Sequence, residues 1–191
     1  MKKNLILIAL YALLTLMFKN ANAQTETNPL SDKILIVVHM QEPVDQKSKE
    51  SSANIIEKIN QLIEETEPEN VIYAKSISKF LNVSFKKICV DKIDTPFDSR
   101  LKIVNQNVFT DESGDVFESD ELNEFIKTKK INQIVIVGRV AEGCITKTIL
   151  SGKKIGYEMF MIPEAIAGRA QESKTKALNK LEKKEIKKLD I

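Results

Sequence analysis

Residues 133–150 read QIVIVGRVAEGCITKTIL. Their first part is an apolar run rich in β-branched side chains, which predicts a buried strand that ends at Gly138. A five-residue bend follows, and Cys144 stands where a helical pattern begins. Unpaired backbone N–H groups and the helix dipole at such a junction favour a thiolate over a thiol. The segment therefore predicts a nucleophilic cysteine, and the chain is worth treating as an enzyme.

Strand-like and helix-like patterns alternate along the rest of the chain. An apolar run at 33–40 predicts a central strand, and a serine at 51 or 52 can cap a helix with isoleucine and leucine at helical spacing. Further strands are expected at 70–75, 88–90, 101–104, 134–138, 157–162 and 186–191, and further helices near 119–126, 142–152 and 170–184. This alternation predicts an α/β fold, a three-layer doubly wound and mainly parallel sheet with helices on both faces.

His39 occupies the end of the first predicted strand. Cys144 lies just beyond the end of the strand at 134–138. In an open parallel sheet the carboxyl ends of the strands lie at one edge, and ligands bind in the crevice there. We therefore expect His39 and Cys144 to face the same crevice.

The first residues have the layout of a secretory signal peptide. A positive start precedes an apolar stretch at 5–18, and Ala21-Asn22-Ala23 offers a small-x-small cleavage site. We expect residues 1–23 to be the signal peptide, 24–32 a polar N-terminal tail and 33–191 the domain. This predicts an exported protein, periplasmic or secreted, with no membrane attachment after cleavage. An uncleaved N-terminal anchor is the alternative.

Composition argues against several classes of function. The formal net charge is +2, and three of the lysines lie in the predicted signal peptide, so the mature chain is close to neutral. Basic residues alternate with acidic ones and no aromatic residues are interleaved with them, which argues against nucleic-acid binding. The sequence has no glycine-rich phosphate loop, and we expect no cofactor.

The cysteines and the single histidine limit metal binding. Cys89, Cys144 and His39 are too few and too far apart to make a plausible zinc cluster, so we expect no metal. Export would permit a disulfide between Cys89 and Cys144, which is the structural alternative to a nucleophile. A domain of this length does not need such a bridge for stability.

Three segments resemble the isochorismatase-like cysteine hydrolases, a superfamily that includes nicotinamidases and N-carbamoyl amidohydrolases. Residues 131–165 are similar to the family's strand, cis-peptide bend and nucleophile, with Cys144 at the nucleophile position. The run 34–41 resembles an apolar first strand that ends in Asp-Met-Gln, and residues 114–122 resemble the segment after the family's catalytic lysine. The resemblance covers most of the mature chain, and the Cys144 motif is its most specific part.

The resemblance implies a set of site residues, two of which depart from the family pattern. Cys144 would be the nucleophile, Val140 and Ala141 the cis-peptide bend, and the backbone N–H groups of Ala141 and Cys144 the oxyanion hole. The family's triad is Asp, Lys and Cys. This chain has His39 at the position of the Asp and Asp111 at the position of the Lys, with Thr110 or Glu112 as alternatives for the latter.

These departures lead to a hypothesis about the catalytic group. Cys144, His39 and Asp111 would form a rewritten triad in which His39 takes the thiol proton and Asp111 orients the imidazole. The hypothesis requires His39 within hydrogen-bonding reach of the Cys144 sulfur. Gln41 and Phe117 could line the pocket or be structural residues.

His39, Asp111 and the protein as a whole also have non-catalytic interpretations. His39 could be a satisfied polar group at the sheet edge, Asp111 could be a turn residue, and the protein could be a catalytically degenerate pseudoenzyme that binds a partner.

On the hydrolase hypothesis, Cys144 attacks a small amide or a related C–N bond. The metal site of the nicotinamidase branch needs several histidines, so we expect neither that metal nor nicotinamide as substrate. Relatives with this fold commonly associate, which leaves a homo-oligomer open.

Overall fold

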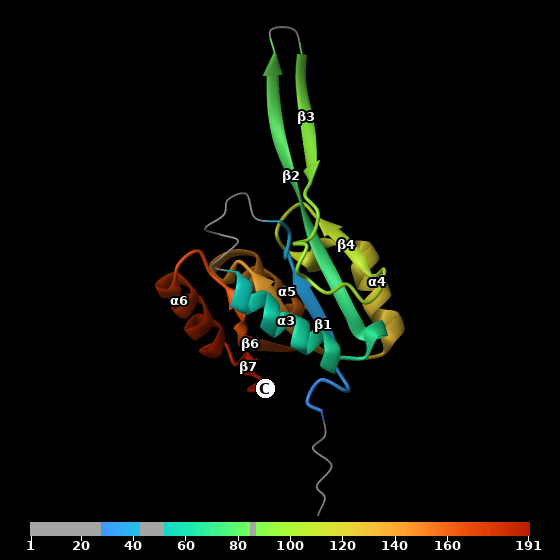
Figure 1. Cartoon of the computed structure of the whole chain (residues 1–191), viewed down its shortest axis with the longest axis vertical. Coiled ribbons are helices and arrows are strands. Elements are labelled where there is room, and N and C mark those ends of the chain that lie inside the picture. The colour runs from blue at the N-terminus through green and yellow to red at the C-terminus, as the bar shows by residue number, and fades with distance from the viewer. Residues whose placement is uncertain (1–27, 43–51, 85–86) are drawn as a thin grey trace, which may run out of the picture.

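The computed structural model describes residues 28–42, 52–84 and 87–191 of the chain. Its centre is a seven-stranded, mainly parallel sheet with the order β3-β2-β1-β5-β6-β7, in which β4 also pairs with β2 (Figure 1). The strands are β1 (Ile34–Val38), β2 (Val71–Ser84), β3 (Lys87–Asp94), β4 (Val108–Asp111), β5 (Gln133–Arg139), β6 (Glu158–Ala167) and β7 (Lys187–Lys188). The expected α/β fold is confirmed.

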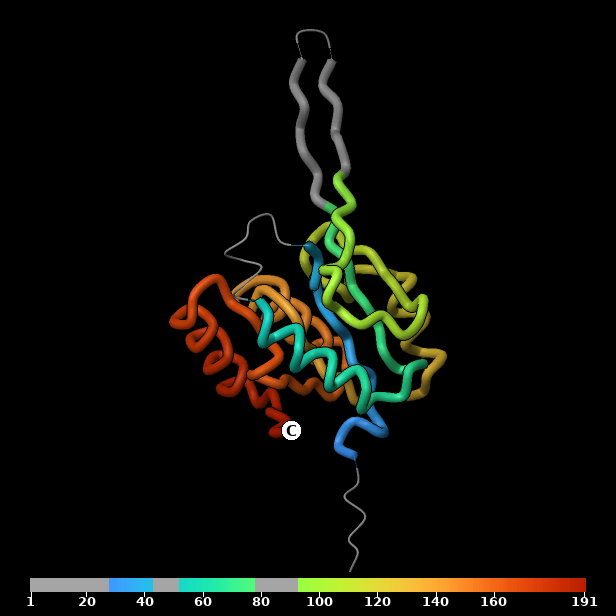
Figure 2. Tube along the Cα trace, in the orientation of Figure 1, coloured from blue at the N-terminus to red at the C-terminus, as the bar shows by residue number. Residues whose placement is uncertain are grey.

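Helices cover both faces of this sheet. They are α3 (Ala53–Glu65), α4 (Asp120–Lys129), α5 (Thr146–Lys154) and α6 (Gln171–Glu182), with short turns η1 (Pro68–Asn70), η2 (Val116–Glu118) and η3 (Ala141–Ile145). The chain can be followed in Figure 2 from β1, through α3 in front of the sheet, to α6 near the C-terminus. Among the described residues, no helix is long and apolar enough to cross a membrane.

The core follows from the alternation of side chains along the buried strands. Odd and even positions of a strand point to opposite faces, so a strand that is apolar throughout feeds two cores. Ile34, Ile36 and Val38 of β1 pack with α4, α5 and α6, whereas Leu35 and Val37 pack with α3. All five residues of β1 are fully buried, as the continuous apolar pattern predicts.

Two segments differ from the sequence-based prediction. Residues 101–104 form no strand; instead Leu101 is buried against α3, and the Tyr73 hydroxyl bonds the backbone at Lys102 and Val104. The strand in this region is β4, which pairs with β2 in parallel. Its four residues alternate between exposed and buried, a signal too short to stand out against the polar residues that surround it.

The sequence predicts two N-terminal segments, a signal peptide and a polar tail. Residues 1–23, the predicted signal peptide, lie outside the described residues. In the segment expected to be a polar tail, Leu30 is buried with α3, and Asn28 donates to the carbonyl of Glu65 at the end of that helix. The last part of that segment is therefore packed on the domain, because it carries an apolar side chain that the sheet can cover.

Parallel pairing brings the carboxyl ends of β1, β4 and β5 to one edge of the sheet. Gly138 sets the close approach of β1 and β5 there. It lies opposite Val38, has a φ of +117°, and a Cβ at this position would overlap the backbone of Val38. Only glycine combines this φ with this approach at low cost. Gly138 therefore fixes the distance between the strand that ends at His39 and the strand that leads to Cys144.

Gly138→Ala should lower the free energy of unfolding by about 2–5 kcal/mol, the combined cost of a left-handed alanine and an overpacked contact. Urea denaturation measures this change. The matched control is Gly156→Ala, because Gly156 has a similar φ of +105° but nothing within 4 Å of an added Cβ. Equal losses for the two variants would show that the contact with Val38 is unimportant.

Candidate active site

His39 begins the site at the end of β1. Its φ of +53° lies in the left-handed region, and its backbone N–H donates to the Ala74 carbonyl at 2.9 Å. A histidine in this conformation is uncommon and costs free energy, which buried surroundings must offset. The side chain is buried, with a relative exposure of 7%. The turn at the strand end therefore aims an imidazole into the protein instead of towards solvent.

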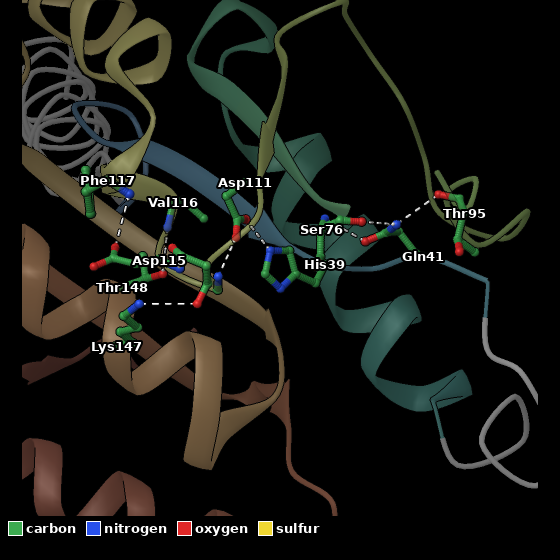
Figure 3. Close-up of polar contacts among 12 residues, drawn as sticks. His39, Gln41, Ser76, Thr95, Asp111, Asp115, Val116, Phe117, Lys147 and Thr148 are labelled. Atoms are coloured by element: carbon green, nitrogen blue, oxygen red, sulfur yellow. Dashed lines mark hydrogen bonds and ion pairs between the residues drawn. The ribbon is translucent and has the colours of Figure 1, made fainter. Parts of the chain in front are cut away.

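Asp111 receives that imidazole. It is the last residue of β4, where pairing with Ser76 of β2 sets its position, and it is 5% exposed. His39 Nε2 lies 2.5 Å from Asp111 Oδ2, and Asp111 Oδ1 accepts the N–H of Gly114 at 2.6 Å (Figure 3). Both carboxylate oxygens thus have partners, which fixes the carboxylate and, through it, the imidazole.

Cys144 lies in η3, the turn between β5 and α5. A cis peptide bond joins Arg139 to Val140, and Gly143 takes φ −124° and ψ −109°, so the chain bends sharply before the thiol. The half-buried Cys144 side chain forms hydrogen bonds with the His39 imidazole and with the backbone N–H of Val140. His39 therefore contacts a carboxylate and a thiol at once.

The electrostatics of this group favour an ion pair. Burial lowers the pKa of His39, but the hydrogen bonds to Asp111 and Cys144 outweigh it and raise the pKa from 6.5 to about 9. The hydrogen bond from His39 lowers the pKa of the Cys144 thiol, against an opposing effect of burial. Near neutral pH the two shifts together favour imidazolium and thiolate.

Gly114 completes the wall beside the thiol. A Cβ built on Gly114 would lie 3.1 Å from Cys144 Sγ, and the residue has a φ of +79°. Lys147, one turn after the cysteine, donates to the Ser113 carbonyl at 3.2 Å and so ties this loop to α5. Sequence reasoning used Gly114 only as part of a resemblance. Its contact with the thiol depends on the pairing of β4 with β2, which no local pattern reveals.

The bend is displaced from its predicted position. Residues Val140 and Ala141 were expected to form the cis-peptide bend, whereas the cis bond is Arg139–Val140, one residue earlier. Ala141 is fully buried, and its carbonyl accepts the N–H and the hydroxyl of Thr146. The backbone N–H of Val140 contacts the thiol. Regular helix also starts later than expected, at Thr146, because η3 intervenes.

Gln41 and Phe117 have structural contacts. The Gln41 side chain donates to the Ser76 and Thr95 carbonyls and accepts the Ser76 N–H, so it ties the end of β1 to β2 and to the segment after β3 (Figure 3). Phe117 is buried in the core, where its ring stacks on Tyr157. Thr110 and Glu112, the alternatives to Asp111, are exposed. The Cys89 side chain lies outside what the structure describes.

The sequence profile of the Isochorismatase domain matches residues 33–189, which is most of the chain. The chain belongs to the isochorismatase family. A comparison with curated proteins gave no match. The resemblance noted in the sequence is therefore confirmed at the level of the family.

Solved structures show the same fold at low sequence identity. An isochorismatase-like hydrolase from Alkaliphilus metalliredigens superposes with a TM-score of 0.65, at 15% identity over 83% of this chain and 94% of that one. The zinc complex of pyrazinamidase from Pyrococcus horikoshii gives 0.59, at 19% identity over 84% and 99%. The YcaC gene product of Escherichia coli, described as an octameric hydrolase of unknown specificity, gives 0.60, at 14% identity over 83% and 74%.

The zinc in the pyrazinamidase complex raises the question of a metal site in this family member. Among the described residues, no group of three or more His, Cys, Asp or Glu side chains could hold a metal ion. The one histidine of the chain is engaged by Asp111 and Cys144. The His, Cys, Asp and Glu side chains of the described residues therefore do not fit a zinc site.

Gly114→Ala should slow the alkylation of Cys144 by iodoacetamide and destabilise the fold by about 1–2 kcal/mol, the cost of a left-handed alanine. The slowing is expected because the added methyl group abuts the sulfur. Alkylation can be followed by mass spectrometry. Gly156→Ala again serves as the control, since it should destabilise the fold without changing the alkylation rate. An unchanged rate in Gly114→Ala would contradict the observed contact.

Proposed function

We propose that this family member is a cysteine hydrolase that cleaves a small amide or a related C–N bond through an acyl-enzyme on Cys144. The observation that carries the proposal is His39, which bonds Asp111 on one side and Cys144 on the other. Such a relay is what an activated thiol nucleophile needs. Membership of the family supports the general reaction type.

In the first half-reaction the Cys144 thiolate adds to the substrate carbonyl. The oxyanion that forms accepts hydrogen bonds from the backbone N–H groups of Ala141 and Cys144, the pair expected from the sequence. The imidazolium of His39 then gives its proton to the leaving nitrogen as the C–N bond breaks. The products are a free amine or ammonia and a thioester on Cys144.

In the second half-reaction water hydrolyses the thioester. Neutral His39 accepts a proton from the attacking water, the carbonyl is attacked, and the thiolate of Cys144 leaves. This returns the thiolate and the imidazolium. Asp111 keeps the ring oriented and stabilises its charge throughout.

The raised pKa of His39 modifies its expected role. The sequence suggested a neutral base that removes the thiol proton during attack. With a pKa of about 9, the imidazole already carries a proton near neutral pH, and the lowered pKa of the Cys144 thiol favours the thiolate. His39 therefore acts first as an acid towards the leaving group, and as a base only in deacylation.

The competing proposal is a binding protein that kept the fold and lost the chemistry. The replacement of the family's Asp and Lys by His39 and Asp111 favours it, because these positions hold the family's other two catalytic groups. Reactivity of the thiol separates the two proposals. Export through residues 1–23 and assembly of identical subunits are further proposals; the first rests on the signal-peptide layout and the second on the octameric hydrolase among the structural neighbours.

Hydrolysis and alkylation should have a characteristic pH dependence. The His39 pKa is raised, so its proton is held below pH 9 and lost as the pH rises through that value. We expect kcat/KM for amide hydrolysis to be bell-shaped, with an alkaline limb near pH 9 and an acid limb below the usual range of a thiol. Iodoacetamide should alkylate Cys144 well below pH 8.

Matched variants identify the groups responsible for hydrolysis and for the reactivity of the Cys144 thiol. Cys144→Ser should abolish hydrolysis, and His39→Ala should move the alkylation of Cys144 to the pH range of an ordinary thiol. Glu112→Gln, next to Asp111 but exposed, serves as the control and should leave both profiles unchanged. A wild-type thiol that is alkylated only above pH 8, together with no hydrolysis across a panel of small amides, would favour the binding protein.

A further inference from the structure

A cavity of about 450 Å³ opens beside the nucleophile turn, at the carboxyl ends of β5 and β6. Arg139 and Val140 line it from one side, and residues 167–171 and Lys174 line it from the end of β6 and the start of α6. Val140 belongs to both places, because its N–H contacts the Cys144 sulfur. The cavity therefore adjoins the turn that carries the thiol.

The lining is cationic. Arg139, Arg169 and Lys174 are among the ten lining residues, and none of the ten is Asp or Glu. In the part of the chain that the structure describes, the side chains of Arg139 and Lys174 make no hydrogen bond or ion pair. Charged groups left without a partner inside a partly buried wall are costly unless a ligand supplies the counter-charge.

Two carboxylates of the described residues act on this region, and neither forms an ion pair with Arg139 or Lys174. Glu142 Oε1 accepts the Arg169 N–H at 3.0 Å and the Ser173 hydroxyl at 3.2 Å, so it is committed to the start of α6. Glu164 acts on Lys174 only through space, and burial lowers the pKa of that lysine. The ammonium of Lys174 is thus partly stripped of water without a close anion.

The start of α6 adds to the positive potential. Its N-cap residue, Ala170, has no side-chain oxygen of its own, and the Ser173 hydroxyl accepts the Ala170 N–H at 3.2 Å. The first turn still contributes the positive end of the helix dipole to this wall, where Glu142 offsets part of that charge. The arginine fork of Arg139 matches the geometry of a carboxylate, and Lys174 supplies a point charge from the other wall.

We propose that this cavity binds a carboxylate group carried by the amide substrate, with Arg139 and Lys174 as its ligands, while the scissile carbonyl lies at Cys144. The inference rests on the proposed hydrolase function and names its substrate class: small amides that bear a carboxylate a short distance from the scissile bond. Neutral amides of the same size are poor ligands.

Two isosteric amides test the charge requirement, the anionic succinamate and the neutral succinamide. Their affinities are measured by isothermal titration calorimetry on the full domain carrying Cys144→Ser, which prevents turnover. Succinamate should bind at least about tenfold tighter, the effect of one charge-assisted hydrogen bond, and its affinity should fall as salt is added. Equal affinities, or no binding of either amide, would overturn the proposal.

Single substitutions then assign the ligands. Arg139→Gln and Lys174→Gln should each weaken succinamate binding by about tenfold. Lys176→Gln is the matched control, because Lys176 lies on the same helix but is exposed and paired with Glu172, and it should change nothing. Circular dichroism establishes that each variant is folded. If a folded Arg139→Gln, Lys174→Gln double variant binds succinamate with the same affinity as the parent, the assignment of these two ligands is wrong.

Failure of the subsite and failure of the hydrolase have different signatures. Charge-dependent binding without hydrolysis by the wild-type protein would keep the carboxylate site and contradict the proposed reaction. Hydrolysis of succinamide as fast as succinamate would keep the reaction and overturn the carboxylate site.

Discussion

The contact between His39 and Asp111 is the interaction on which the site depends. Two ionisable side chains meet at 2.5 Å in a place where both are almost fully buried. Removing one partner from such a pair leaves an uncompensated charge and typically costs about 3–5 kcal/mol. The contact also joins the end of β1 to the end of β4, so it holds together the two segments that surround the thiol. The reactivity that we propose for Cys144 depends on it, because the carboxylate raises the pKa of the imidazole.

The sheet makes this contact available. β1 lies between β2 and β5, and β4 reaches the same edge by pairing with the far side of β2. Parallel strands deliver their carboxyl ends to one crevice, and glycine at 138 lets β5 approach β1 closely enough for the turn after it to meet His39. The cavity lined by Arg139 and Lys174 lies along the same edge, at the ends of β5 and β6. The order of the strands in the sheet therefore decides which side chains can meet in the site.

Much of this could be predicted from sequence because the signals are local. The apolar runs of β1 and β5 and the periodic helices each reflect physics within a few residues. β4 was not predicted, because its position depends on pairing with a strand more than thirty residues away. The cis bond was displaced by one residue, since no residue type marks a non-proline cis bond. The charge state of His39 was out of reach too, because it depends on a burial and a distance that only the folded chain defines.

The most direct test uses the fact that His39 is the only histidine in the chain. A protein without a histidine tag shows the ring signals of a single imidazole by NMR. The titration of these signals reports the pKa of His39 alone. The account predicts a pKa of about 9 in the wild-type protein and a clearly lower pKa in Asp111→Asn, where the carboxylate is gone. A wild-type pKa at or below 6.5, or one that Asp111→Asn leaves unchanged, would contradict the imidazolium that the mechanism requires.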